Sequence, residues 1–423
     1  MRVLWILGEL PIPADSGAKL RIMGLLKELA GRHAITAVAL DPGTERARDV
    51  EELESVCESV VLLPSQRRPS GAKLLFGAVA NLFSRLPYSV AKYCTRDTEY
   101  ALAQVAAAPF DLIQCENIGF HRYLLAPASG PRILATHNVE ADVWRQRARL
   151  CRNPLLSAYL SRQATKMARY EAGLAKSYDW VTAVTESDAA RLRTDYGIPN
   201  VTVVPNGVDT DYFTPTGEAA EPGLVVFTGA MDYAPNDDAA RYFLKTIWPL
   251  IRQRVPAAHF SVVGRRPSPS LRALAKRADH VEVTGAVPDV RPYLARASVV
   301  VVPLRMGGGS RLKILEAMAM GRPVVATTMG AEGIDLEPSR HILVADDPTA
   351  LTEKTAFLLK NQGFGASLGQ EGRTAVASRY SWAECSALLG RTWRHAREAA
   401  PATPSPGRRS PRQTRRLPDC RAQ

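Results

Sequence analysis

Hydrophobic residues in this chain form short, continuous runs that alternate with longer segments of helical spacing. RVLWILG at residues 2–8 is one such run, and LRIMGLLKELAGRH at residues 20–33 carries apolar residues three and four positions apart. ITAVAL follows as a second run. The order strand, loop, helix, strand is typical of a parallel sheet covered by helices. We therefore predict that the chain opens with a doubly wound α/β domain.

The same alternation starts again near the middle of the chain. VTVVPNGVDTDYF contains the turn formers Pro205, Asn206 and Gly207, and GLVVFTGAMDYAPNDDAARYF then repeats strand, loop and helix. A chain of 423 residues is also too long for one ordinary core. We predict Rossmann-like domains at 1–205 and 206–377, an amphipathic helix at 378–396 and a disordered basic tail, rich in Pro, Ser and Arg, at 397–423.

The most informative stretch for chemistry is PLRMGGGSRLKILEAMAMGRP, which follows the buried-strand run SVVVVP. Free N–H groups and the helix dipole attract an anion where a glycine loop opens into a helix, and glycine lets a phosphate approach the backbone. Arg311 and Lys313 at the helix start oppose the dipole unless they meet a negative group. We therefore expect a phosphate-bearing ligand at the loop, which consists of Gly307, Gly308, Gly309 and Ser310.

Glu316 lies one turn further on, between Leu315 and Ala317 on a helix that is apolar on most faces. A carboxylate on a buried side needs partners, and ligand hydroxyls can supply them. The alternative is a glycine-rich turn with two solvated basic residues, because short glycine motifs also occur without ligands. The buried character of the helix favours the ligand site.

GGGSRLKILEAMAMGRPVVATTMGAEGI resembles the nucleotide-sugar signature of family-4 retaining glycosyltransferases of the GT-B fold, in the subgroup with a GGG-x-R-x-K donor loop. The resemblance covers residues 1–396 and implies two facing Rossmann-like, doubly wound domains with a C-terminal crossover helix returning to the first. The first domain would then bind the acceptor and the second the nucleotide sugar. The resemblance also implies that Glu316 binds the ribose hydroxyls of the donor, while Arg311 and Lys313 hold its diphosphate. Many members carry a second Glu where this chain has Gly308.

The resemblance extends to residues outside this loop. THNVE delivers His137 to the end of a predicted strand, and the matching His of related enzymes lies close to the donor sugar. Alone, His137 also fits a structural role, and Arg21 fits a solvated helix surface. The expected acceptor or phosphate side comprises Gly17, Arg21, Asn138 and Glu140. The expected donor set comprises Gly229, Val287, Gly307, Gly308, Gly309, Ser310, Leu312 and Glu316, with His137, Arg311 and Lys313 as catalytic residues. Since the loop at residues 230–233 lacks the usual Arg and Lys, Arg265 is a candidate helper.

Net charge and cysteine usage indicate which partners and which cellular compartment to expect. The net charge of +12 suits anionic donors and the inner leaflet of a membrane, and no RNP-like, helix-turn-helix or zinc motif points to nucleic acid. Six scattered cysteines without a CxxC pair fit a reducing, cytoplasmic compartment, with peripheral attachment to the inner membrane face. Asp209-x-Asp211 lies in the predicted linker, so we expect no metal and no cofactor besides the donor. No apolar run reaches the ~20 residues of a membrane span.

Residues 65–95 mix basic and large apolar residues at helical spacing. Two interpretations stay open: an interfacial helix that enters anionic lipid, or an acceptor-side insertion packed on the domain. We favour packing.

The residues and the resemblance together predict a retaining, metal-independent glycosyltransferase. It would move a sugar from a nucleotide diphosphate sugar to a glycan or lipid-linked acceptor in surface polysaccharide or glycoconjugate assembly, with Arg311, Lys313, loop amides and the helix dipole stabilising the leaving group. The alternatives are an inactive scaffold, suggested by Gly308 and the bare loop at residues 230–233, and a GT-B epimerase. A dehydrogenase is disfavoured because the first turn lacks G-x-G-x-x-G.

Overall fold

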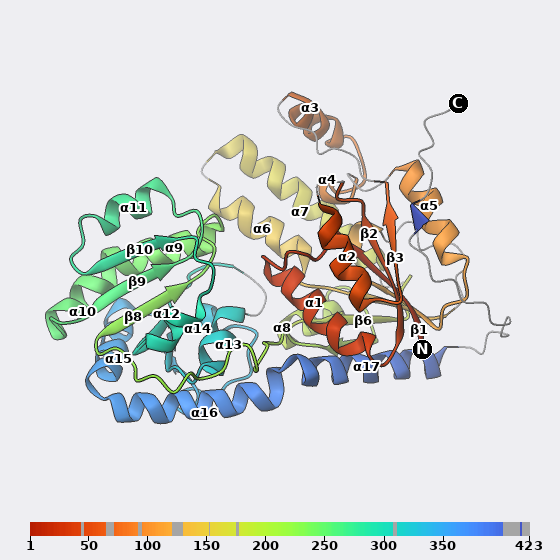
Figure 1. Cartoon of the computed structure of the whole chain (residues 1–423). Coiled ribbons are helices and arrows are strands. Elements are labelled where there is room, and N and C mark those ends of the chain that lie inside the picture. Colours follow the sequence, from red (N-terminus) through yellow and green to blue (C-terminus); the bar gives the residue numbers. More distant parts are fainter. Residues whose placement is uncertain are drawn as a thin grey trace. The chain divides into compact units, whose positions relative to one another are not determined.

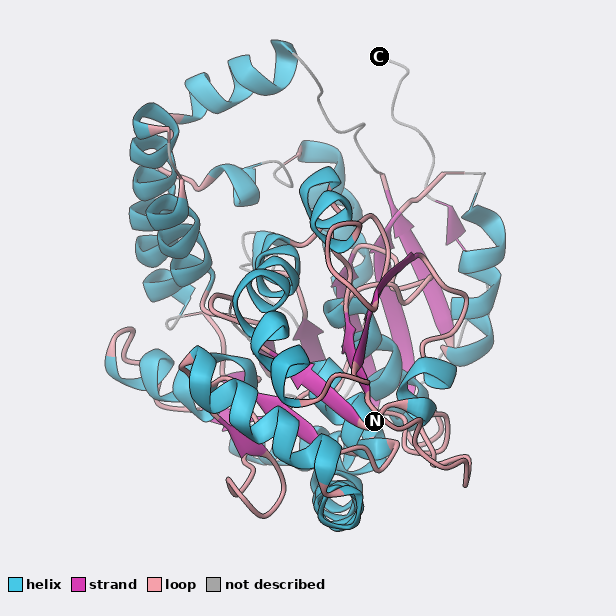
Figure 2. Ribbon diagram, turned by 90° about the vertical axis from the view of Figure 1, so that its left-hand side faces the viewer, coloured by secondary structure: helices cyan, strands magenta, loops and turns pink. Residues whose placement is uncertain are grey.

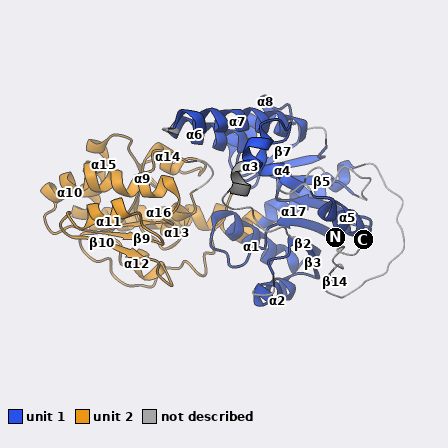
Figure 3. Cartoon of the chain, turned by 90° about the horizontal axis from the view of Figure 1, so that it is seen from above, with its two compact units in different colours: residues 1–204, 386–423 blue, residues 205–385 orange. Residues whose placement is uncertain are grey.

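The computed structural model describes residues 1–43, 46–64, 72–91, 95–120, 130–151, 153–174, 177–307, 311–400 and 415–416. The chain forms two compact units (Figure 3). Unit 1 comprises Met1–Val204 together with Ser386–Gln423, and unit 2 comprises Pro205–Cys385.

Unit 1 is built on a parallel sheet with the order β14-β3-β2-β1-β4-β5-β6-β7. Its strands are β1 (Arg2–Gly8), β2 (Ala34–Leu40), β3 (Ser59–Leu63), β4 (Leu112–Cys115), β5 (Arg132–Ala135), β6 (Trp180–Ala183), β7 (Val201–Val203) and β14 (Arg415–Arg416). Strand order reverses beside β1, as in a doubly wound fold, so ligands are expected at the carboxyl ends of β1 and β4.

Helices connect these strands and cover the sheet (Figure 1). They are α1 (Gly17–Ala30), α2 (Ala47–Val56), α3 (Ala72–Asn81), α4 (Tyr88–Ala91), α5 (Arg96–Ala106), α6 (Glu140–Leu150), α7 (Pro154–Leu174) and α8 (Glu186–Thr194). The chain comes back to unit 1 in the last long helix, α17 (Trp382–Ala399). Trp393 of α17 is fully buried and meets Trp5 of β1 edge to face, with ring centroids 5.4 Å apart. The helices between successive strands of unit 1 are crossover connections, which parallel strands need because a hairpin cannot join them.

Unit 2 repeats the plan with six parallel strands in the order β10-β9-β8-β11-β12-β13. The strands are β8 (Leu224–Thr228), β9 (His259–Val263), β10 (Val281–Gly285), β11 (Val299–Val302), β12 (Val324–Ala326) and β13 (Leu343–Val344). The helical elements are α9 (Ala234–Tyr242), the π-helical turn η3 (Phe243–Ile247), α10 (Trp248–Arg254), α11 (Pro269–Ala275), α12 (Arg291–Arg296), α13 (Leu312–Ala319), α14 (Thr328–Ala331), α15 (Pro348–Lys360) and α16 (Gln362–Tyr380). Figure 2 shows the strands with helices around them. Here the order reverses between β8 and β11.

The apolar runs of the sequence explain these sheets. All four residues of β11, VVVV, and all five of β8, LVVFT, are buried. A parallel strand covered on both faces is expected to be continuously apolar, as these are. Two doubly wound α/β domains were predicted, and the structure confirms them.

Two details at the C-terminus differ from expectation. The helix predicted at 378–396 is divided between the end of α16 and α17, and α17 continues to Ala399, so Arg397 is helical and not part of a tail. Because Trp393 and Ala396 are buried, the helix carries an anchored face close to its end. Most of the expected tail lies outside the described residues. Within the described part of the chain, no helix is long and apolar enough to cross a membrane.

Candidate functional site

Because β8 and β9 are neighbouring parallel strands, two glycine-containing loops, one after each strand, lie side by side at their carboxyl ends. Gly229 follows β8 with φ +155°, and its N–H donates to the Val263 carbonyl at 3.0 Å. A Cβ atom at Gly264, where φ is +152°, would lie 1.8 Å from the Gly229 carbonyl oxygen. This backbone contact therefore requires glycine at position 264 and holds Gly229 in place at the carboxyl edge of the sheet.

Lys313 of α13 reaches this edge from the neighbouring crossover. Its Nζ donates to Asn236 Oδ1 at 2.6 Å, and Asn236 Nδ2 in turn donates to the Ala230 carbonyl at 2.9 Å. The ammonium also lies 4.5 Å from the ring centroid of Phe227. Burial, reinforced by the charge of Arg311, lowers the pKa of Lys313 to about 7. An anion bound here would restore the full charge of the ammonium.

Arg311 occupies the position before the first residue of α13 and is almost entirely buried. Its Nε and Nη2 donate to the Met329 carbonyl, both at 3.4 Å, and Nη2 lies 3.9 Å from Glu332 Oε2. Burial lowers the pKa of Arg311. Gly307, with φ +116°, leaves room for the guanidinium, because a Cβ there would lie 3.2 Å from Arg311 Nη1. The two predicted cations of the loop thus share one edge of the sheet.

Glu316 follows Lys313 by one helical turn and is partly buried. Burial raises the pKa of its carboxyl group to about 7, and the charge of Lys313 opposes that rise. The group can therefore donate or accept hydrogen bonds near neutrality, which suits vicinal hydroxyls. Leu312 and Val287 are partly buried and pack against the core of unit 2. Gly308, Gly309 and Ser310 lie outside the described residues.

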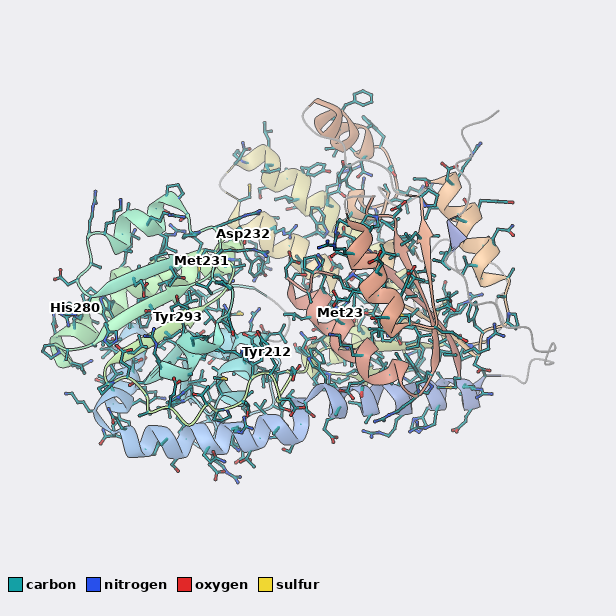
Figure 4. All side chains as sticks on the ribbon, viewed as in Figure 1. Met23, Tyr212, Met231, Asp232, His280 and Tyr293 are labelled. Atoms are coloured by element: carbon teal, nitrogen blue, oxygen red, sulfur yellow. The ribbon has the colours of Figure 1, made fainter. Side chains whose placement is uncertain are left out.

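The loop after β8 lacks Arg and Lys, but the loop after β9 supplies two arginines. Arg265 Nε lies 3.5 Å from Asp232 Oδ1, and Arg266 Nη1 lies 3.3 Å from Asp232 Oδ2. Asp232 follows Met231 in the loop after β8 (Figure 4). The candidate helper Arg265 is therefore paired with a carboxylate next to Gly229.

A second cluster lies in unit 1, in a cavity of about 370 Å³ at the carboxyl ends of β1, β4 and β5. His137, Asn138 and Glu140, all predicted site residues, line it together. Ser16 and Ala18, on either side of Gly17, line it as well. The lining does not include Arg21, which is 1% exposed. Its charge acts instead on the buried Glu116 by lowering the pKa of that carboxyl group.

Glu116 anchors the histidine of this cavity. His137 Nε2 lies 3.1 Å from Glu116 Oε2, while Glu116 Oε1 accepts hydrogen bonds from Trp5 Nε1 at 2.8 Å and Gln114 Nε2 at 2.7 Å. Burial raises the pKa of Glu116, but the hydrogen bond and charge of His137, the charge of Arg21 and the hydrogen bond from Gln114 together outweigh burial and hold the pKa below its usual value. Trp393 Nε1 donates to Gln114 Oε1, so the network reaches α17.

Glu171 of α7 orders the far side of the cavity. It accepts hydrogen bonds from the N–H groups of Glu140 and Ala141 at 2.7 and 3.1 Å, and from the hydroxyl of Tyr196 at 3.0 Å. Burial raises the pKa of Glu171 to about 7. It therefore fixes the start of α6 directly after His137 and Asn138.

Sequence reasoning missed three residues of these two clusters: Glu116, Glu171 and Asn236. Glu116 was detectable, since it directly follows a predicted strand on the ligand side of a parallel sheet. Glu171 and Asn236 act from helices, and no local pattern marks them. Among the described residues, no group of three or more His, Cys, Asp or Glu is arranged to hold a metal ion.

Comparison with known protein families gives a consistent assignment for both units. Residues 16–212 match the model of Glycosyltransferase Family 4, and residues 222–361 match the model of Glycosyl transferases group 1. The chain is 25% identical over 275 residues to the lipopolysaccharide core biosynthesis mannosyltransferase LpcC of Rhizobium leguminosarum bv. viciae, which covers 60% of this chain and 76% of LpcC.

A further curated relative is the GDP-mannose-dependent monoacylated alpha-(1-6)-phosphatidylinositol monomannoside mannosyltransferase of Corynebacterium glutamicum. It is 27% identical over 228 residues, which is 48% of this chain and 59% of the relative. The match thus spans less than two thirds of the length of that relative.

Solved structures show the same fold. Sucrose-phosphate synthase from Thermosynechococcus elongatus superimposes with a TM-score of 0.68 at 19% identity over 95% of this chain and 100% of that chain. Anabaena HepE in complex with UDP gives a TM-score of 0.65 at 15% identity over 93% of this chain and 100% of that chain. The two family matches and this fold assign the chain to the group 1/family 4 glycosyltransferases of the GT-B fold.

Proposed function

We propose that this glycosyltransferase transfers a hexose from a nucleotide diphosphate sugar with retention of anomeric configuration and without a metal ion. The observation that carries the proposal is the convergence of Arg311 and Lys313 at the carboxyl edge of the unit 2 sheet, next to Gly229. Burial makes the positive charges of Arg311 and Lys313 energetically costly. A bound diphosphate would offset that cost, which is typical of a functional site. The complexes of HepE with UDP and UDP-glucose support a nucleotide-sugar donor.

The donor diphosphate becomes the leaving group when its bond to the anomeric carbon breaks. Arg311, Lys313 and the N-terminus of α13 supply positive potential for the developing charge, so no divalent cation is required for that role. Glu316 binds the ribose hydroxyls. The acceptor hydroxyl attacks from the same face from which the leaving group departs, and its proton passes to the oxygen of the departing diphosphate. The configuration at the anomeric carbon is thereby retained.

Unit 1 supplies the acceptor side. His137 lines the cavity that receives the acceptor hydroxyl. The mannosyltransferase names of the two relatives support a hexose donor and a lipopolysaccharide-type or lipid-linked acceptor. We place this reaction at the cytoplasmic face of the membrane, where such acceptors are anchored.

A transfer assay tests the proposal. The full chain is incubated in EDTA with UDP- and GDP-hexoses and with lipid-linked or oligosaccharide acceptors, and NMR reports the product anomer. We expect one donor to give product with retained configuration in EDTA. An inverted product, or a strict need for added metal, would refute the mechanism. Nucleotide binding without any product would favour the scaffold alternative.

A further inference from the structure

Helix α3 of unit 1 presents large apolar side chains to solvent. Phe76 and Val79 are 76% and 50% exposed, and Phe83, just beyond the helix, is 90% exposed. Packing on the domain is the favoured prediction for residues 65–95, of which 65–71 and 92–94 lie outside the described residues. Asn81 and Tyr88 are hydrogen-bonded to α7 as that prediction requires, but the three apolar side chains face solvent. Figure 1 shows α3 projecting from unit 1 beyond α4 and α7. Contiguous exposed apolar residues of this size mark an interaction surface.

A cationic cavity lies beside these residues. It has a volume of about 740 Å³ between the segment 83–85 and α7, and Phe83 lies in its wall. Four of its lining residues are cations, and none of the described residues that line it is acidic; the cations are Arg85, Arg162, Lys166 and Arg169. Like charges gathered without a counter-charge repel one another, which favours an anionic partner.

The segment that follows α3 is firmly attached to α7. Gln163 Nε2 donates to Asn81 Oδ1 at 2.9 Å, and Gln163 Oε1 accepts from the Tyr88 N–H at 2.9 Å. The buried ammonium of Lys166 donates to the Asn81 carbonyl, and Arg162 Nη2 donates to the Leu82 carbonyl at 3.1 Å. Buried, satisfied polar contacts of this kind fix the backbone. The apolar side chains and the cations are therefore presented together.

We propose that this α3 surface (Phe76, Val79, Phe83, Arg85, Arg162 and Arg169) docks the enzyme on an anionic phospholipid bilayer. The arginines take the headgroup phosphates, while Phe76, Val79 and Phe83 enter the boundary of the acyl chains. Charge complementarity selects a membrane, since a purely apolar protein partner would leave the cations buried and unpaired. The proposal deepens the membrane location given under the proposed function, and its test requires no transfer.

Vesicle flotation of the full chain tests the proposal. The vesicles are phosphatidylcholine alone or phosphatidylcholine mixed with phosphatidylglycerol. We expect binding to the mixed vesicles only, weakened by salt. Phe76→Ser and Phe83→Ser each lower partitioning by about tenfold. Arg85→Gln and Arg169→Gln each lower it by about fivefold. In detergent solution without vesicles, all four variants release nucleoside diphosphate from the donor at the wild-type rate.

Matched controls come from α5 of the same unit, where Tyr100 is 65% exposed and Arg96 is exposed. Tyr100→Ser and Arg96→Gln leave partitioning unchanged. A chain truncated after Ala399 keeps its binding.

Equal binding to neutral vesicles, or wild-type partitioning of the serine variants, overturns the proposal. Loss of binding on truncation alone assigns docking to the basic C-terminal segment and also overturns it. Intact docking without any transfer would count only against the proposed function.

Discussion

His137 Nε2 lies 3.1 Å from Glu116 Oε2, and this contact joins a residue that lines the unit 1 cavity to a buried carboxylate. The second oxygen of Glu116 is held by Trp5 and Gln114. The orientation of His137 is therefore set by a network that reaches the C-terminal helix through Trp393. Glu116 acts as a positioning residue for His137.

Glu116→Gln should impair turnover more than donor binding. The amide oxygen of Gln keeps one acceptor, but the negative charge facing His137 is lost. Because a hydrogen bond to a charged group contributes about 1.5–3 kcal/mol, we expect kcat to fall by about 10- to 100-fold with little change in donor KM. Steady-state kinetics measures this, with Glu99→Gln on the exposed face of α5 as the control. An equal rise in donor KM would contradict a positioning role.

The same carboxylate makes stability depend on pH. The pKa of Glu116 is lower in the folded protein than its usual value of 4.5, so the stabilisation is complete above about pH 4.5. It is lost as the pH falls through the folded pKa. Between about pH 5 and pH 3, the free energy of unfolding should therefore decline less in Glu116→Gln than in the wild type. Urea denaturation at both pH values measures the difference, and parallel declines would contradict the assignment.

Nucleotide affinity should fall as the pH rises above neutrality. Since the pKa of Lys313 is about 7 in the free protein, its ammonium is lost at higher pH unless the diphosphate holds the proton. Linkage limits the change to about tenfold in Kd per pH unit, and isothermal titration calorimetry between about pH 7 and pH 9 measures it. Lys313→Met should bind weakly with a flatter profile, whereas the exposed Lys245→Met should match the wild type.

Glu316 complicates that profile, because its pKa is also about 7. Its ionisation above neutrality favours binding of ribose hydroxyls and opposes the effect of Lys313. Glu316→Gln should therefore steepen the decline in affinity with pH. A profile of the same slope in all variants would exclude both groups.

Gly264→Ala should distort the donor edge of unit 2. Its Cβ would collide with the Gly229 carbonyl oxygen, and the backbone φ of +152° is unfavourable for a side chain. We expect a loss of about 2 kcal/mol or more in the free energy of unfolding, measured by urea denaturation. Gly363→Ala is the control, since a Cβ there has no atom within 4 Å and lies in α16. Equal stability of both variants would contradict the close backbone approach.

Local sequence patterns predicted much of the fold. The apolar runs at β8 and β11 and the alternation with helices predict two doubly wound sheets, because continuous apolar strands require cover on both faces. The end of α17 was less predictable. Its anchoring depends on the contact of Trp393 with Trp5, which are distant in sequence and lie together only in the folded unit.

Some residues of the candidate site could likewise be predicted from the sequence, and others could not. Arg311, Lys313 and Glu316 lie within one local motif, so their spacing alone predicted a shared location. Asn236 belongs to a different crossover and meets Lys313 only because β8 and β11 are neighbours in the sheet. The exposure of α3 was also unpredictable, since an apolar helix has the same pattern whether it packs on a domain or faces solvent.

The most direct test of the central claim is calorimetric and thermal-shift binding of UDP, GDP, ADP and NAD in EDTA. The wild type is compared with Arg311→Ala and with the exposed control Arg254→Ala. We predict that one nucleoside diphosphate stabilises the wild type and the control, that NAD does not, and that Arg311→Ala weakens binding by about 10- to 100-fold. Failure of every nucleoside diphosphate to bind at millimolar concentration, or wild-type affinity in Arg311→Ala, would contradict the donor site.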